Sequence, residues 1–217
     1  IGKDIFKVFP NVDIFIRGES EFVLLDIVQK LEKSKSINNV RGILYKDKSG
    51  DIIETPKQEI ISNMDLIPHY DYSIFQKQIF WRPYNGSVIR AVDYELSRGC
   101  IYTCSYCVET TIQRYYGFTE RGKRGALNNA MAYLRTKSAQ RIYDELRILS
   151  EEYKVNLVRC QDTNFLTINR LVLNQLADLM EANPLDIKLY IETRAEGINA
   201  GAINLLNRLN VDGIGMG

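Results

Sequence analysis

The sequence predicts an α/β protein, and the clearest signal lies in its C-terminal part. Four apolar segments of strand type, residues 92–97, 155–160, 187–191 and 211–216, alternate with segments of helical periodicity. Strands that alternate with helices of this length form parallel sheets through right-handed crossovers. We therefore expect a parallel βα array from residue 92 onward, either the first part of a barrel or a doubly wound sheet.

Three helices are expected between these strands, because apolar residues recur there at i, i+3, i+4 and i+7. The first helix should begin at Ser138, since serine is a preferred N-cap residue. The expected apolar faces are Ile142, Leu146, Leu149 and Tyr153, then Ile168, Leu171, Val172, Leu176, Leu179 and Met180, and finally Ala202, Leu205, Leu206 and Leu209.

A smaller strand–helix–hairpin block is expected in residues 1–55. Residues 12–17 have strand character, residues 20–33 have helical periodicity, and the strand-like segments 41–46 and 51–55 flank a polar connection that contains glycine. The expected apolar face of the helix consists of Leu24, Ile27, Val28 and Leu31.

The segment from residue 56 to residue 91 is expected to be a linker, because its periodicity fades and Pro68 and Pro83 interrupt it. Its aromatic side chains should pack onto a neighbouring domain. They are Tyr70, Tyr72, Phe75, Phe80, Trp81 and Tyr84.

Composition and charge are those of a globular protein. The chain has 217 residues, of which 45% are hydrophobic, enough to bury the core of one large or two small domains. Its 28 basic and 27 acidic residues give a net charge of +1, so nucleic acid or an anionic membrane is not expected as a partner. We find neither an apolar run of membrane-span length nor a signal peptide, and expect a cytoplasmic protein.

The most specific signal for function is a CxxxCxxC motif formed by Cys100, Cys104 and Cys107, directly after the first strand of the array. Iron–sulfur clusters are normally held by four thiolates, so a compact set of three predicts a cluster with one iron open to another ligand. An open position is typical of catalytic metal centres. Active sites of βα arrays also lie at the carboxyl ends of the strands, where this motif falls.

A structural zinc site is the alternative for these cysteines. Zinc usually takes four ligands from paired CxxC elements, and the further candidates here are Cys160 and His69. Cys160 lies in an apolar strand, where we expect a buried side chain. His69 lies in the linker, where we expect a surface or packing residue, and neither is assigned a role.

The motif and its setting resemble the radical S-adenosylmethionine (SAM) superfamily. This resemblance implies that Cys100, Cys104 and Cys107 hold a 4Fe–4S cluster whose fourth iron binds the amino and carboxylate groups of SAM. It implies that Tyr106 contacts the adenine through its backbone. An electron from a reductant such as flavodoxin or ferredoxin would then cleave SAM, and the resulting 5′-deoxyadenosyl radical would abstract hydrogen from a small-molecule substrate.

Other segments resemble the branch of this superfamily that carries a cobalamin-binding domain before the barrel. They are residues 12–21, the linker, residues 161–165 and residues 213–217, so the resemblance covers nearly the whole chain. It implies that residues 1–55 are the C-terminal remnant of a Rossmann-like cobalamin-binding domain. Residues 92–217 would be the first half of a radical SAM partial TIM barrel.

Two features depart from that branch. The DxHxxG element by which many members ligate cobalt is absent, so cobalamin is expected only with a part upstream, or this lineage binds none. A barrel needs about eight strands, and four are expected here. Because the chain also starts at Ile1 without methionine, we expect it to be a fragment of a longer protein.

Polar residues follow the second and third strands of the array. Asp162, between Gln161 and Asn164, could accept a hydrogen bond from the SAM ammonium group, or it could form a turn or N-cap. Arg194 could pair with the SAM carboxylate and Glu192 could bind the ribose or the substrate, or these two residues could form an internal ion pair.

Between Cys107 and Ser138 we expect a long insertion, which is either a solvated lid or, because basic residues are interleaved with aromatic ones, a surface that binds a single-stranded nucleic acid or a phosphorylated substrate. These residues are Arg114, Tyr115, Tyr116, Phe118, Arg121, Lys123, Arg124, Arg135 and Lys137.

The expected function is that of a radical SAM enzyme that carries out a methyl transfer or rearrangement on an unactivated carbon of a small or lipid-like metabolite. The alternatives are modification of RNA or of a polypeptide, and an iron–sulfur module for binding or electron transfer that does not cleave SAM.

Overall fold

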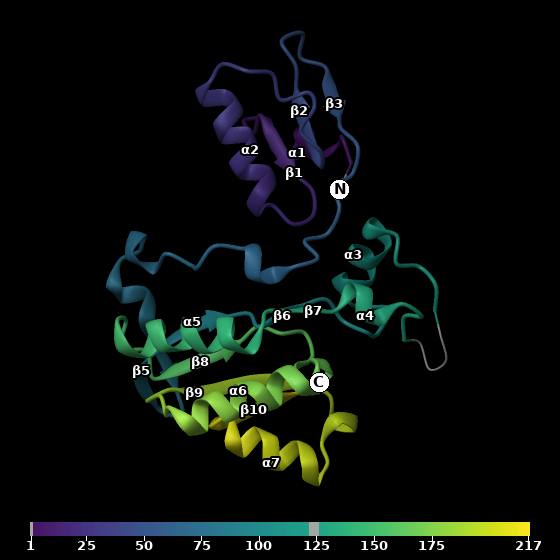
Figure 1. Ribbon diagram of the computed structural model, residues 1–217. Helices are drawn as coiled ribbons and strands as arrows, with labels where there is room; N and C mark the ends of the chain where they lie inside the picture. Colours follow the sequence, from purple (N-terminus) through teal and green to yellow (C-terminus); the bar gives the residue numbers. More distant parts are fainter. Residues whose placement is uncertain (1, 122–125) are drawn as a thin grey trace. The chain divides into compact units, whose positions relative to one another are not determined.

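The computed structural model describes residues 2–121 and 126–217, which form two compact units (Figure 1). Unit 1 consists of Ile1–Ile61 and Thr111–Phe118, and unit 2 consists of Ser62–Thr110 and Thr119–Gly217. Among the described residues, we find no helix with the length and apolar character needed to cross a membrane.

Unit 1 contains a three-stranded antiparallel sheet of order β1-β2-β3. The predicted helix and hairpin are confirmed, and Ser20 stands at the N-cap of the helix. The elements are α1 (Ile5–Val8), β1 (Ile14–Ile16), α2 (Glu21–Glu32), β2 (Ile43–Lys46) and β3 (Ile52–Glu54).

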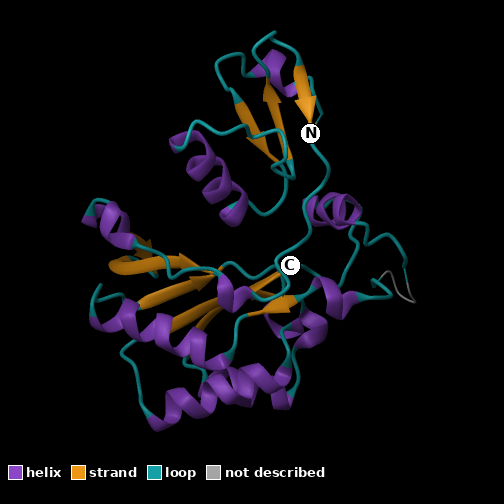
Figure 2. Ribbon diagram, turned by 45° about the horizontal axis from the view of Figure 1, so that its top comes forward, coloured by secondary structure: helices purple, strands orange, loops and turns teal. Residues whose placement is uncertain are grey.

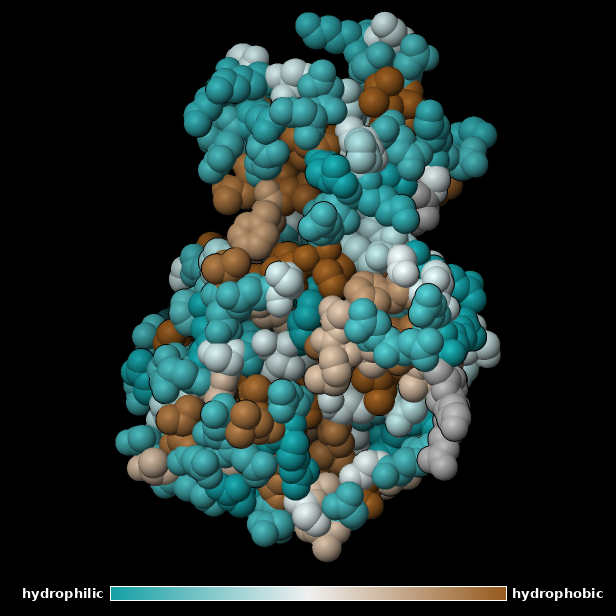
Figure 3. All heavy atoms as spheres, turned by 45° about the vertical axis from the view of Figure 1, so that its right-hand side comes forward, coloured by the Kyte–Doolittle hydropathy of each residue, from teal (hydrophilic) through white to brown (hydrophobic). Residues whose placement is uncertain are grey.

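The predicted buried face of α2 is wrong for three of its four residues. Val23 and Ile27 are the buried residues of this helix, and they pack against Val40 and Ile43. The predicted Leu24, Val28 and Leu31 are exposed. Helix α2 carries apolar residues on two sides, and the sheet of unit 1 covers the side with Val23 and Ile27. Apolar groups reach the molecular surface in several places, among mostly polar side chains (Figure 3).

Unit 2 is built on a five-stranded sheet of order β10-β9-β8-β5-β4. The four predicted strands of the βα array are present, and β5, β8, β9 and β10 pair in parallel. The strands are β4 (Trp81–Tyr84), β5 (Ser87–Tyr94), β8 (Leu157–Cys160), β9 (Lys188–Thr193) and β10 (Val211–Met216). The helices between them are α5 (Ala139–Glu151), α6 (Arg170–Ala182) and α7 (Ala200–Arg208).

The three helices lie along one face of this sheet (Figures 1 and 2). Strand residues such as Val92, Val158 and Leu189 point to the helices and form the core with them. The predicted N-cap is confirmed, because the Ser138 side chain accepts a hydrogen bond from the Arg141 backbone N–H. The opposite face of the sheet is polar: Asp93 there accepts hydrogen bonds or ion pairs from Arg82, Arg159 and Gln161.

Part of the predicted linker belongs to the sheet. Strand β4 and the start of β5 form an antiparallel hairpin that turns at Asn85 and Gly86, whose φ angles are 48° and 75°. An Asn-Gly pair between strands is a strong hairpin signal, and it was missed because proline and aromatic residues obscured the alternation. The linker aromatics Tyr72 and Phe80 pack against Tyr153 within unit 2.

The described parts of the segment between Cys107 and Ser138, residues 108–121 and 126–137, contain regular secondary structure. They include α3 (Val108–Tyr116), α4 (Ala130–Tyr133) and β7 (Arg135–Thr136), which pairs with β6 (Ser97–Arg98). Several of their basic and aromatic side chains serve internal contacts: Lys137 is buried in an ion pair with Glu145, and the Tyr116 hydroxyl accepts a hydrogen bond from the Glu19 backbone N–H. Lys123 and Arg124 lie outside the described residues.

Candidate functional site

A pocket of about 340 Å³ lies at the carboxyl ends of the parallel strands of unit 2. It brings together six of the seven residues that the sequence singles out: Cys100, Cys104, Tyr106, Cys107, Glu192 and Arg194. The other lining residues are Tyr102, Glu109, Thr163, Asn164, Thr193, Gly215, Met216 and Gly217.

The path of the chain into this pocket is fixed just before the first cysteine. After β5 the chain leaves the parallel sheet, and Ser97 and Arg98 pair with β7. Gly99 then has a φ of +95°, a backbone conformation that residues with a side chain rarely adopt. A Cβ atom at Gly99 would lie 2.5 Å from the carbonyl oxygen of Tyr133, so glycine is required for this close approach.

The three cysteines of the motif lie in one short loop. Cys100 is buried, whereas Cys104 and Cys107 are half-buried. The backbone N–H of Tyr102 donates to Cys100 Sγ at 3.4 Å, and Cys107 N–H donates to the Cys104 carbonyl at 3.1 Å, which forms the turn into α3. Burial raises the pKa of the Cys100 thiol, so a positively charged group is needed to hold it as a thiolate.

These thiols suit an iron–sulfur cluster. Among the residues that the structure describes, no group of three or more His, Cys, Asp or Glu side chains converges on one metal position. The thiolates of a cluster bind different iron atoms, so they need not converge. Hydrogen bonds to the cluster sulfurs tune such centres, and the contact of Tyr102 N–H with Cys100 Sγ has this geometry.

Arg194 places a permanent positive charge at the pocket wall. Its guanidinium lies over the Tyr102 ring, and Nη1 is 4.0 Å from Cys104 Sγ. The other end of the guanidinium, Nη2, donates to Glu196 at 2.6 Å, and this hydrogen bond raises the pKa of Arg194. The alternative prediction was an ion pair between Glu192 and Arg194. This pairing does not fit the geometry, because the guanidinium of Arg194 forms its ion pair with Glu196.

Asp162 is not among the residues that line the pocket, where one of its two expected roles, a contact with the SAM ammonium group, would place it. Its side chain is buried and accepts hydrogen bonds from the backbone N–H of Ser97 at 2.6 Å, from Ser97 Oγ, and from the Leu96 N–H at 3.3 Å. Burial raises the pKa of Asp162 to about 6, although the hydrogen bonds from Ser97 and Leu96 oppose this shift. The next two residues, Thr163 and Asn164, line the pocket instead.

Among the further lining residues, Tyr102 and Glu109 carry aromatic and acidic groups to which the sequence analysis assigned no role. Tyr102 lies within the motif, where its aromatic ring gave no separate signal. Glu109 stands in the first turn of α3, two positions after Cys107, and its buried Oε1 atom has no hydrogen-bond partner among residues 2–121 and 126–217. An acidic residue in the first turn of a helix usually looks like a helix-dipole contact, which hides a possible ligand-binding role.

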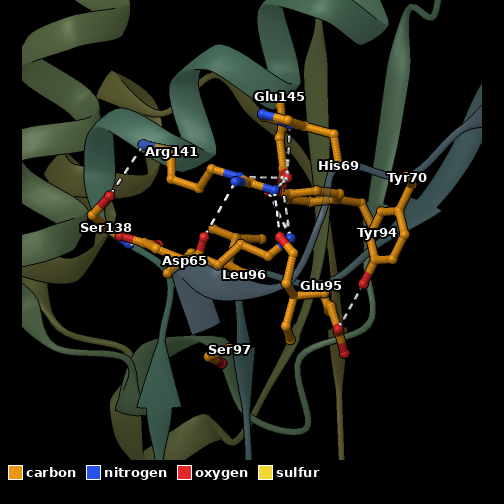
Figure 4. Close-up of polar contacts among 12 residues, drawn as sticks. Asp65, His69, Tyr70, Tyr94, Glu95, Leu96, Ser97, Ser138, Arg141 and Glu145 are labelled. Carbon is orange, nitrogen blue, oxygen red and sulfur yellow. Dashed lines mark hydrogen bonds and ion pairs between the residues drawn. The ribbon is translucent and has the colours of Figure 1, made fainter. Parts of the chain in front are cut away.

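Cys160 and His69 lie elsewhere in unit 2. Cys160 is buried in β8, where burial raises the pKa of its thiol well above the ordinary value. His69 Nδ1 is 3.1 Å from Glu145 Oε1 on α5. Figure 4 shows His69 and Arg141 meeting at Glu145.

Comparison with protein-family models finds no match. Among curated proteins, the chain is 25% identical over 190 residues to an uncharacterised methyltransferase of Pyrococcus horikoshii, covering 88% of this chain and 36% of that protein. It is 26% identical over 213 residues to the anaerobic magnesium-protoporphyrin IX monomethyl ester cyclase of Synechocystis sp. (96% and 38%). It is 27% identical over 182 residues to the cytidylyl-2-hydroxyethylphosphonate methyltransferase of Streptomyces wedmorensis (71% and 30%).

Solved structures share the fold at low sequence identity. The radical SAM methyltransferase TsrM of Kitasatospora setae, with cobalamin and a 4Fe–4S cluster bound, matches with a TM-score of 0.66 at 15% identity over 98% of this chain and 39% of that chain. The cobalamin-dependent SAM radical enzyme OxsB, with aqua-cobalamin and SAM bound, matches with a TM-score of 0.66 at 18% identity (99% and 29%). The chain thus spans about a third of the length of the proteins that it matches.

Proposed function

Because the chain belongs to the radical SAM superfamily, in the branch whose members carry a cobalamin-binding domain, we propose that its pocket holds a 4Fe–4S cluster and SAM. Cys100, Cys104 and Cys107 are the proposed cluster ligands. The observation that carries this proposal is that these three thiols and Arg194 line one pocket at the carboxyl ends of the strands. When bound and reduced, such a cluster supplies an electron that cleaves SAM and generates a 5′-deoxyadenosyl radical.

The charged groups of the pocket suit the two ends of an amino acid moiety. Arg194 can bind a carboxylate through its planar fork, and it is held in place by the Tyr102 ring and by Glu196. Glu109, whose buried Oε1 atom finds no partner in the part of the chain that the structure describes, can accept hydrogen bonds from an ammonium group. Glu192 is proposed to bind the ribose or the substrate, and the backbone of Tyr106, whose side chain is exposed, is proposed to contact the adenine.

We propose that unit 2 contains the first half of a partial TIM barrel, and residues 1–55 the remnant of a cobalamin-binding domain. The helices lie on one face of the parallel sheet, and the other face carries the polar cluster around Asp93, as the inner face of a barrel would. Cobalamin is proposed for the whole protein only, because the chain has no DxHxxG element.

The proposed reaction is a methyl transfer or a rearrangement on a small molecule. This polar inner face, with Arg82, Arg159 and Gln161 around Asp93, favours a polar substrate over a lipid-like one. The alternative of RNA modification loses part of its support, because Lys137 is buried in an internal ion pair.

The test is production of 5′-deoxyadenosine by the full-length protein after anaerobic reconstitution, reduction and addition of SAM. We expect turnover with the unmodified protein and none with Cys104→Ala. A cluster-loaded protein that forms no 5′-deoxyadenosine, in an assay where a known radical SAM enzyme does, would instead support a module for iron–sulfur binding or electron transfer.

A further inference from the structure

The carboxylate of Asp162 holds the place where the chain leaves the sheet towards the cysteines. The two adjacent strands end side by side there, since Gln161 N–H donates to the carbonyl of Tyr94 at 2.8 Å. Beyond this contact, Asp162 Oδ1 accepts from the N–H and the hydroxyl of Ser97, and Oδ2 accepts from the N–H of Leu96.

These hydrogen bonds give a partner to two buried backbone N–H groups, those of Leu96 and Ser97. Leu96 and Ser97 are buried, and a buried N–H without a partner is costly. Asp162 is only 2% exposed, so burying its charge has a cost of its own. A buried carboxylate that binds three donors from one turn fixes the geometry of that turn.

The turn is also held on its other side. Ser97 and Arg98 pair with Thr136 and Arg135 of β7, and Gly99 lies against the carbonyl of Tyr133. Only Arg98 and Gly99 separate Ser97 from Cys100, and both are held by these contacts. A displacement of Ser97 therefore also displaces Cys100.

We propose that Asp162 is a positioning residue, which orients Cys100 towards the pocket by clamping Leu96 and Ser97 and does not itself contact SAM. This inference rests on the proposed function in one respect, namely that Cys100 is a cluster ligand. The clamp itself exists before any cluster is bound, so it can be tested separately.

The experiment uses the full-length protein in its cluster-free, reduced form. Asp162→Asn has nearly the same shape but presents an amide N–H₂ to at least one of the three donors, and Ser97→Ala removes only the hydroxyl contact. Glu145→Gln is the matched control, because it makes the same carboxylate-to-amide change in a buried network on α5 that does not include the cysteine loop. The rate of alkylation by iodoacetamide is measured for each cysteine by tandem mass spectrometry.

We expect Asp162→Asn to speed alkylation of buried Cys100 about tenfold, as lost hydrogen bonds to a charged group allow local opening. Ser97→Ala should give a smaller increase, and Cys104 and Cys107 should change little in either variant. After reconstitution, Asp162→Asn should bind less iron, and the electron paramagnetic resonance signal of its reduced cluster should broaden. Glu145→Gln should lower stability while leaving the Cys100 rate unchanged.

Unchanged alkylation of Cys100 in Asp162→Asn would overturn the proposal, and so would equal acceleration of all three cysteines in Asp162→Asn and Glu145→Gln. If Asp162→Asn keeps its full iron content and an unchanged alkylation rate but binds SAM more weakly, Asp162 contacts SAM directly. If Asp162→Asn does not fold, Ser97→Ala tests the proposal. Faster alkylation of Cys100 than of Cys104 and Cys107 in this variant would support it, and an unchanged Cys100 rate would contradict it. Retention of the cluster by Cys100→Ala would instead refute the ligand assignment and leave the clamp standing.

Discussion

The guanidinium of Arg194 lies over the ring of Tyr102, with 4.6 Å between the guanidinium carbon and the ring centroid. This stacking joins the end of β9 to the middle of the cysteine motif, 92 positions earlier in the chain. The same guanidinium is 4.0 Å from Cys104 Sγ. A fixed cation therefore stands beside the sulfur that we propose as a cluster ligand.

Replacing Arg194 with glutamine should weaken SAM binding about 10- to 100-fold, because a bidentate charge-assisted contact to the carboxylate is lost. Affinity can be followed by the change that SAM causes in the electron paramagnetic resonance spectrum of the reduced cluster. Glu196→Gln is the control, since it removes the outer partner of Arg194 and keeps the cation. Equal SAM affinity in Arg194→Gln and the unmodified protein would rule out the carboxylate contact.

Cys104→Ala should abolish both the SAM-responsive spectrum and SAM cleavage, because two thiolates do not hold a site-differentiated cluster. Cys160→Ala should leave the iron content unchanged, since Cys160 is buried in β8 and does not line the pocket. Iron and sulfide analysis of both variants checks this. Loss of iron in Cys160→Ala at retained folding would contradict the ligand set.

Gly99→Ala should be much more destabilising than Gly50→Ala. Both glycines have positive φ, which costs a residue with a side chain about 1–2 kcal/mol. A Cβ atom would meet the Tyr133 carbonyl at 2.5 Å at position 99, whereas it would meet nothing within 4 Å at position 50. In denaturant unfolding, Gly99→Ala should therefore lose more stability than Gly50→Ala, and the iron content should fall in Gly99→Ala alone. Similar behaviour of the two variants would mean that the turn before Cys100 tolerates displacement.

Asp162 should make stability fall as the pH rises from about 4 to about 6. Burial raises its pKa from 3.8 to about 6, while Glu95 adds to this shift and the donors on Ser97 and Leu96 oppose it. The folded state therefore holds the proton more tightly than the unfolded state, and its advantage is complete below the unfolded pKa. At about 1.4 kcal/mol per unit, roughly 3 kcal/mol is lost on passing through the folded pKa.

The measurement is the free energy of unfolding of the unmodified protein and of Asp162→Asn between pH 3.5 and pH 7, values chosen to bracket the two pKa values. The difference between the two proteins should shrink or change sign across this range. A constant difference would show that Asp162 does not titrate there.

Lys137→Met should destabilise unit 2 by about 3–5 kcal/mol, because it leaves a buried carboxylate without its buried cation. Lys137 Nζ is 2.7 Å from Glu145 Oε2, and both side chains are nearly inaccessible. Tyr94 also donates to Glu145, whose other oxygen accepts from Arg141 (Figure 4). The double variant Lys137→Met/Glu145→Gln should recover part of this loss in denaturant unfolding, whereas purely additive effects would argue against a coupled pair.

Local patterns predicted much of the fold. Alternating strands and helices gave the four parallel strands of unit 2, and Ser138 is an N-cap as its residue type indicates. The prediction of the buried face of α2 was wrong, because Leu24 and Val23 both have helical spacing to other apolar residues. Periodicity alone does not say which side of the helix the sheet covers. The β4–β5 hairpin was missed in the same way, since aromatic residues outweighed a two-residue turn signal.

Within the candidate site, the sequence by itself determined the chemistry of the cysteine motif, because three thiols within eight positions are near one another in any fold. It also placed Glu192 and Arg194 at the end of a strand. Tertiary structure alone decided that Arg194 reaches Tyr102 and that Asp162 faces Ser97 and not the pocket. It also decided that Glu109 has a buried oxygen without a partner among the described residues. These contacts join residues on different strands, and their partners depend on how the strands pack, which no local spacing records.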